Sequence, residues 1–294
     1  MYFPVADIRI GFWVPPLTAF VISFFTSMGG VSGAFLLLPF QMSVLHFDSP
    51  AVSATNHIFN VVAIPSGVYR YIREKRMVWP LTWAVILGTL PGVLAGALVR
   101  IRYLPDPTTF KRFAALVLLY IGLRLVENIW RSRRQSGKGG SLQTAGEVTG
   151  QRFSLQEISY TYQDKQYSVS TGALFLLSLV VGMLGGIYGI GGGAIMAPFL
   201  VTVFGLPVHT VAGAALMGTM ITSVAGVAFF QVMAPFYPQV AVGPDWLLGF
   251  MFGLGGLLGM YCGARMQRYV PTRLIKSILA LCILFTAVRY LGLF

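Results

Sequence analysis

The sequence has few of the residue types that build enzyme sites. Its 294 residues include nine acids, three histidines and two cysteines, and only 10% are charged. Cys262 and Cys282 stand in apolar stretches, so we expect them to pack rather than to form a disulfide or a metal pair. The sequence offers no His/Asp/Glu cluster, Ser-His-Asp set or cysteine pair. An enzyme is therefore disfavoured, and we expect no metal and no cofactor.

The acids are also absent from the middle of every apolar stretch. Asp48, Asp106 and Asp245 lie at segment ends, Glu74 and Glu127 lie near loops, and the others fall in the tails or the linker. Carboxylates inside the membrane are the usual sign of a proton relay or a cation pathway. Their absence argues against both.

Apolar residues dominate the chain instead, at 56% with a mean hydropathy of +0.74. This composition indicates an all-α integral membrane protein of about ten helical segments, because lipid requires every backbone group to be paired internally. The N-terminal tail has no basic leader or cleavage site, so we expect the first helix to be retained. The segments are 14–28, 34–47, 51–72, 81–99, 110–129, 172–188, 194–206, 210–233, 246–264 and 274–293.

The second half of the chain resembles the first. An offset of 159 residues pairs Gly30 with Gly189, Gly33 with Gly192 and, further on, the prolines and valines of the next segments. Each half holds five segments, an odd number, so the second half should enter the membrane in the opposite orientation. We predict a first transmembrane repeat at 1–134, a polar linker at 135–170 and an inverted second repeat at 171–294.

Basic residues in the short loops set the expected orientation. The loops after the third, fifth and ninth segments are rich in Lys and Arg, whereas the loop at 234–244 has neither. The positive-inside rule then makes those three loops and the linker cytoplasmic and places both termini outside. Four basic residues would lie outside, against the rule: Arg100, Arg102, Lys111 and Arg112.

The linker changes character along its length. Residues 136–150 are rich in Gly, Ser and Thr and indicate a flexible segment, while 154–170 alternate polar with apolar residues and predict a small hairpin that turns near Asp164. A plain connector is the preferred interpretation, and a regulatory or partner-binding role is the alternative.

Two glycine turns interrupt the apolar runs at matching places. The first contains Gly30, Val31, Ser32 and Gly33, and the second contains Gly189, Gly191, Gly192 and Gly193. Helices that begin just after each turn would direct free N–H groups and positive dipole ends into a cavity near the midplane, which suits an anion. Close helix packing is the alternative for these turns. For the glycines spaced by four, we prefer packing: Gly88, Gly92, Gly96, Gly255, Gly259 and Gly263.

The third segment carries the densest polarity of any apolar run. Asn56 and Asn60 share a helical face, and Thr219 aligns with Asn60 in the second repeat. These side chains could donate hydrogen bonds to an anion or could join helices, and the sequence does not separate the two roles. His57 is a candidate for proton coupling, because it titrates near neutral pH and lies in a span centre.

These motifs resemble those of the sulfite exporter TauE/SafE family, also called the four-toluene-sulfonate uptake permeases. The resemblance rests on Gly-Gly-Val-Ser-Gly-Ala leading to Leu-Pro-Phe at 38–40, on Gly-Ile-Gly-Gly-Gly leading to Ala-Pro-Phe at 197–199, and on Ala-Thr-Asn at 54–56 followed by Asn60. It covers both halves and leaves out the linker. It implies a permease of the bacterial inner membrane for small sulfur-containing anions such as sulfite, sulfonates or organosulfur acids.

The function expected from the sequence is secondary transport of such an anion by alternating access, with the anion held at the two glycine-turn helix starts. A passive anion channel and a membrane partner subunit of a sulfur-metabolism enzyme are the alternatives. The net charge of +12 reflects topology and attraction to anionic lipid, and it also favours an anionic solute. Membrane lipids and the sulfur anion are the expected partners, a homodimer is left open, and nucleic acid is not expected.

Overall fold

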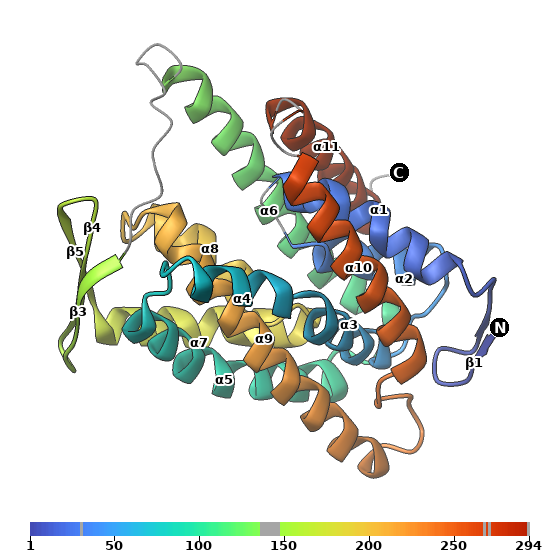
Figure 1. Cartoon of the computed structure of the whole chain (residues 1–294). Coiled ribbons are helices and arrows are strands. Elements are labelled where there is room, and N and C mark those ends of the chain that lie inside the picture. The colour runs from blue at the N-terminus through green and yellow to red at the C-terminus, as the bar shows by residue number, and fades with distance from the viewer. Residues whose placement is uncertain (30–31, 136–147, 267–268, 270–271, 293–294) are drawn as a thin grey trace.

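The computed structural model describes residues 1–29, 32–135, 148–266, 269 and 272–292. Within them the chain is mostly helical (Figure 1). The helices of the first half are α1 (Val14–Gly29), α2 (Ala34–Ser43), α3 (Ala51–Ala63), α4 (Pro65–Arg73), α5 (Trp79–Arg102) and α6 (Pro107–Gln135). Those of the second half are α7 (Thr171–Tyr188), α8 (Gly192–Thr202), α9 (Val208–Met233), α10 (Trp246–Met266) and α11 (Thr272–Tyr290), with a short 3₁₀ turn at Ala234–Phe236.

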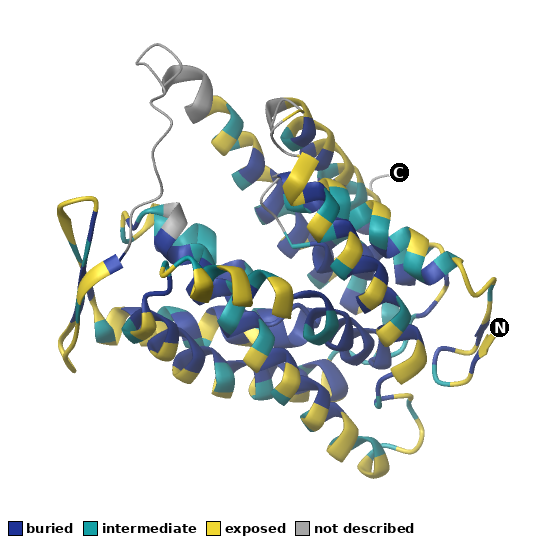
Figure 2. Cartoon of the chain, viewed as in Figure 1, coloured by how far each residue is buried: buried dark blue, intermediate teal, exposed yellow. Residues whose placement is uncertain are grey.

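The helices have the length and apolar character of a membrane protein. Five of the described helices are long and apolar enough to cross a bilayer, namely α5, α6, α7, α9 and α10, and α1, α2 and α8 are shorter. Many helices carry large apolar residues that are exposed. Figure 2 shows buried and exposed positions along the same helices. The predicted all-α membrane fold is therefore confirmed. Of the two helices that precede the glycine turns, α1 is shorter than a span, whereas α7 has full spanning length.

The third apolar segment, predicted as one helix, forms two. It breaks into α3 and α4 between Ala63 and Pro65. Pro65 has no N–H to donate to the preceding turn, so the run of helical hydrogen bonds is interrupted there although Ile64 keeps helical angles. Arg70 and Arg73 then lie in the last turn of α4, next to the loop that leads to α5.

Glycines spaced by four line two close helix contacts, as predicted. A Cβ added at Gly92 would collide with the carbonyl of Leu179 on α7, and one at Gly259 would collide with the carbonyl of Phe20 on α1. The backbones of α5 and α7, and of α10 and α1, therefore approach as only glycine allows. The full sets are Gly88, Gly92 and Gly96 against Phe175, Leu179 and Met183, and Gly255, Gly259 and Gly263 against Pro16, Phe20 and Phe24.

The helix contacts correspond between the two halves. The partners of the glycines on α7 and α1 differ by the same 159 residues that relate the two turns, since 175 − 16, 179 − 20 and 183 − 24 all equal 159. In addition α3 packs on α10 as α9 packs on α5, and α6 packs on α11 (Figure 1). An inverted repeat would produce this correspondence, and the inversion itself stays a prediction.

The linker contains more structure than the predicted hairpin. Strands β4 (Glu157–Tyr162) and β5 (Lys165–Ser170) form that hairpin, with Gln163 and Asp164 at positive φ in its turn. A third strand, β3 (Val148–Phe153), pairs with β4, and sequence analysis did not anticipate it. Most of the stretch predicted as flexible, residues 136–147, lies outside the described residues. A further two-stranded sheet, β1 (Tyr2–Phe3) and β2 (Ile8–Arg9), precedes α1.

The three-stranded sheet docks on helix ends from both halves. Gln151 of β3 accepts a hydrogen bond from the Trp79 N–H at 2.9 Å and donates one to the Met77 carbonyl at 3.2 Å. Tyr160 of β4 is fully buried, and its hydroxyl lies 2.7 Å from that of Thr210 in α9. The sheet therefore joins the loop before α5 to the start of α9.

Candidate functional site

The two glycine turns differ in their backbone geometry. In the second turn Gly189 follows the end of α7 with φ of 81° and Gly191 precedes α8 with φ of 72°. Residues other than glycine rarely adopt these backbone conformations. In the first turn Gly33 has an ordinary helical φ of −60°, and space is what requires glycine there, because a Cβ would lie 2.9 Å from Ser23 Oγ. Gly30 and Val31 lie outside the described residues.

A tyrosine from the second turn reaches the helix that follows the first. Pro39 lies inside α2 and has no N–H, so the Phe35 carbonyl lacks its helical partner. Tyr188, fully buried at the end of α7, donates its hydroxyl proton to that carbonyl at 3.0 Å. Tyr188 thus satisfies a polar group of the first half from the second.

Asn56 joins the two turns directly. Its side-chain Nδ2 donates to the carbonyl of Ala34 at 3.3 Å and to the carbonyl of Gly189 at 3.1 Å. One amide group therefore touches the start of α2 and the end of α7, which places the two turns side by side. Ser53, one helical turn earlier on α3, adds a bond to the carbonyl of Ile187 at 3.1 Å.

His57 and Asn60 converge on Ser223 of α9. Asn60 Nδ2 donates to Ser223 Oγ at 3.3 Å, and Ser223 Oγ lies 3.1 Å from His57 Nδ1. When the Ser223 hydroxyl donates a hydrogen bond to Nδ1, the neutral ring of His57 carries its hydrogen on Nε2, which then acts as a donor. Gly226 leaves room beside that nitrogen, because a Cβ there would lie 2.8 Å from Nε2.

The start of α8 packs against α9 through small residues. Gly192 N–H lies 3.4 Å from Thr222 Oγ1, and a Cβ at Gly193 would collide with the carbonyl of Ala215 and lie 2.7 Å from Thr219 N. Thr219 bonds the carbonyl of Ala215 with its own hydroxyl at 2.8 Å. Glycines at the start of α8 are therefore needed for close packing as well as for any approach to a ligand.

The cluster keeps several polar atoms without a partner. Asn56, His57 and Asn60 are fully buried, yet Asn56 Oδ1, His57 Nε2 and Asn60 Oδ1 make no hydrogen bond. Ser23 Oγ, which faces Gly33, is also buried and unpartnered. Buried polar atoms are nearly always satisfied, so a group of unsatisfied ones at two helix starts makes this cluster the candidate site for a small polar ligand.

The structure thus brings most of the predicted site residues together. Ser32 accepts a hydrogen bond from the Ala34 N–H at 3.3 Å at the first helix start. Sequence analysis did not select Ser223, Thr222, Ser53 or Tyr188, which complete the cluster. The polar run of α9 signalled the first two residues, whereas nothing in the sequence pairs Tyr188 with a carbonyl of α2. No group of three His, Cys, Asp or Glu residues suited to a metal occurs in the described part of the chain.

Comparison with known proteins covers almost the whole chain. A family model described as "Sulfite exporter TauE/SafE" matches residues 16–290. A Bacillus subtilis (strain 168) protein named "Probable membrane transporter protein YunE" is 22% identical over 277 residues, which are 91% of this chain and 93% of that protein. No solved structure matches the chain.

Proposed function

Because the chain belongs to the sulfite exporter TauE/SafE family, we propose that it is a secondary transporter that moves small sulfur-containing anions across the inner membrane. Membership and the similarity to YunE make it a membrane transporter and not an enzyme. The proposal adds the substrate class, sulfite, sulfonates or organosulfur acids, and an alternating-access mechanism in a fold of two inverted repeats at 1–134 and 171–294.

One observation carries the proposal: Asn56 holds both glycine turns within reach of a single amide group. The helices α2 and α8 begin there, and the first N–H groups of a helix have no acceptor within it. Their positive dipole ends favour an anion, and His57 Nε2–H can add a donor from the side. The site contains no lysine or arginine, so binding would depend on aligned N–H groups rather than on a full opposite charge.

The burial of the cluster supports an alternating-access mechanism. The residues that hold it belong to α2, α3, α7 and α9, and all three of Asn56, His57 and Asn60 are shielded from solvent. A ligand enters such a site only when the contacts of α3 with α7 or with α9 separate on one side. His57 remains our candidate for coupling transport to protons, since it links α3 to Ser223 of α9.

Flux into proteoliposomes tests the transport proposal. The purified chain should take up ³⁵S-sulfite or a labelled sulfonate with saturation, and an unlabelled anion on the far side should accelerate uptake by exchange. Linear uptake together with single-channel currents would indicate the passive channel instead. Absence of saturable movement for every sulfur anion tried would refute the proposal.

Two variants test the proposed site within that assay. Asn60→Ala should raise the half-saturating concentration by the equivalent of about 1–3 kcal/mol, the value of one or two hydrogen bonds. His57→Gln should abolish pH dependence while binding is retained if the residue couples protons. If Asn60→Ala destabilises the protein without changing affinity, its amide serves only to join α3 to α9.

A further inference from the structure

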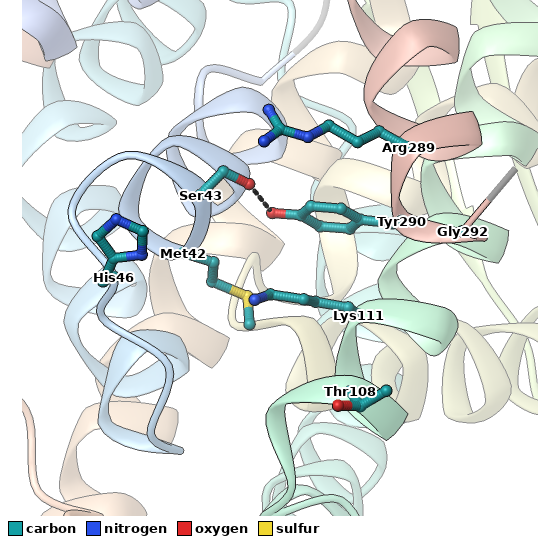
Figure 3. Close-up of a pocket in the computed structure, with 8 residues that line it drawn as sticks. All are labelled: Met42, Ser43, His46, Thr108, Lys111, Arg289, Tyr290 and Gly292. Carbon is teal, nitrogen blue, oxygen red and sulfur yellow. Dashed lines mark hydrogen bonds between the residues drawn. The ribbon is translucent and has the colours of Figure 1, made fainter. Parts of the chain in front are cut away.

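A second group of polar side chains surrounds a cavity at the far end of α2. The cavity has a volume of about 280 Å³ and lies where α2 ends, α6 begins and α11 ends. Since α2 has ten residues, it separates this cavity from the first glycine turn by about 15 Å. Figure 3 shows the lining residues, which are Met42, Ser43, His46, Thr108, Lys111, Arg289, Tyr290 and Gly292.

The charge around this cavity is positive. Lys111 and Arg289 line it, and Arg100 lies nearby with its guanidinium stacked 3.8 Å from the ring centre of Phe110. The only carboxylate paired with these cations in the described part of the chain is Asp48, 3.3 Å from Lys111 Nζ. Three cations against one carboxylate leave a surplus of two positive charges.

Arg289 is free to bind a ligand, whereas its counterpart in the other half is not. By an offset of 165 residues Arg289 corresponds to Arg124, and Gly292 corresponds to Glu127. Arg124 pairs with Glu127 at 2.9 Å. In the described residues Arg289 has no such carboxylate, and its exposed side chain faces the cavity. The repeat thus keeps the arginine at both places, and among the described residues only Arg124 has a carboxylate partner.

The rest of the lining supplies hydrogen-bonding groups. His46 has φ of 56°, an uncommon conformation for a residue other than glycine, and its ring stands at the cavity wall (Figure 3). Ser43 and Tyr290 join their hydroxyl groups at 2.8 Å, which ties the end of α2 to the end of α11. Thr108 adds a hydroxyl from the first turn of α6.

The cavity has room for a small ligand. A volume of about 280 Å³ equals roughly nine waters at about 30 Å³ each, and it falls just below the range of about 300–1,000 Å³ typical for drug-sized molecules. A small oxyanion with part of its hydration shell fits this space.

We infer that this cavity is a vestibule that binds a small oxyanion, with Lys111 and Arg289 as its charged groups, before the anion reaches the glycine turns. The inference rests on the proposed function for the class of ligand. It also explains why Lys111 departs from the positive-inside pattern, because it serves a binding site at that face. The vestibule lies at the start of the 29-residue α6.

Calorimetric titration of the purified full chain with sulfite tests the vestibule without measuring transport. Arg289→Gln should weaken binding about tenfold, the loss expected for one charged hydrogen bond, and Arg289→Lys should restore part of it. Arg112→Gln is the matched control, because it removes the same charge from an exposed residue next to Lys111 that does not line the cavity. Equal effects of Arg289→Gln and Arg112→Gln would overturn the vestibule.

A lipid headgroup is the competing occupant. A neighbouring cavity shares Ser43 and Arg289 but is otherwise lined mostly by apolar residues such as Phe40 and Phe285, which suit an acyl chain. The titration is therefore repeated in micelles with and without phosphatidylglycerol. Binding of sulfite that depends on Arg289 in lipid-free micelles supports the vestibule, whereas a response to the lipid with none to sulfite overturns it.

The two proposals fail in different ways. Arg289-dependent binding of sulfite without saturable flux would refute transport and retain the vestibule. Saturable flux whose half-saturating concentration is the same in Arg289→Gln and Arg112→Gln would refute the vestibule and retain transport.

Discussion

Asn56 is the residue on which the junction of the two turns depends. Its replacement by leucine, of similar size, should lower the free energy of unfolding by about 1–3 kcal/mol, because the carbonyls of Ala34 and Gly189 lose a donor in a buried place. Thr82→Val is the control, since Thr82 is equally buried but bonds only Val78 in its own helix. Chemical unfolding in detergent measures both. Equal losses would mean that Asn56 does not hold the halves together.

Gly193 gives a second prediction for a single residue. Gly193→Ala should destabilise the protein by about 1–3 kcal/mol, because the added Cβ meets the backbone of Ala215 and Thr219, which cannot rotate away. Gly172→Ala, also in a helix, has nothing within 4 Å of the new atom and should be neutral or slightly stabilising. Thermal unfolding compares the two, and tolerance of Gly193→Ala would show that α8 can shift away from α9.

The linker sheet is the element whose docking is easiest to perturb. Tyr160→Phe removes the 2.7 Å contact with Thr210 and should loosen the sheet by about 0.5–1.5 kcal/mol. Hydrogen exchange should then rise in β3, β4 and β5 and not in the buried parts of α5 and α7. Tyr167→Phe, whose ring stacks on Tyr160, is the control that keeps the Thr210 contact. Unchanged exchange in Tyr160→Phe would show that the sheet docks through β3 alone.

Docking of the sheet should also weaken at high pH. Burial raises the pKa of Tyr160 from 10.0 to about 12. A folded-state pKa above the unfolded one means that the stabilisation is complete below pH 10 and is lost as the pH rises through about 12. The difference in tyrosinate absorbance between the unmodified chain and Tyr160→Phe reports this ionisation. A midpoint near 10 would mean that the side chain is open to water.

Most of the helices could be predicted from the sequence. Apolar length predicted the helices, and glycine spacing predicted which faces of α5 and α10 lie against another backbone, because both signals are local. Pro65 is a residue type that often interrupts a helix, but the apolar run around it led to the prediction of one segment at 51–72. Strand β3 was missed because its contacts through Gln151 are made with a distant loop.

The candidate site was predictable in its residue types and not in its partners. The sequence indicated that Asn56, His57 and Asn60 share a region of one helix with the glycine turns nearby. That Asn56 would reach Gly189, and that Asn60 and His57 would meet at Ser223, depends on how α3 packs against α7 and α9. Contacts between residues 130 to 170 positions apart in the sequence cannot be inferred from the local pattern of polar and apolar residues.

Orientation in the membrane is a property of the whole molecule, and labelling can test it. In a chain with Cys262 and Cys282 replaced by serine, Gln239→Cys should react with an impermeant maleimide in intact cells, because the loop at 234–244 is expected outside. Ser154→Cys in the linker should react only after permeabilisation, because the basic loops beside it are held inside. Both positions are exposed in the structure, so access depends on the membrane side alone. The reverse pattern would invert the orientation and place the vestibule at the cytoplasmic face.

The glycine-lined contacts of α5 with α7 and of α1 with α10 each tie a helix of one half to a helix of the other. Helices that pack backbone against backbone lose many close contacts when they separate, so we expect each pair to move as one body. In the proposed alternating-access cycle the moving bodies should therefore be such helix pairs and not the two halves of the sequence. The helices α3 and α9 are joined by a few hydrogen bonds, each worth about 1 kcal/mol, so we expect the movement to occur between them. A ligand that replaces these hydrogen bonds would then shift the population between the closed state and an open one.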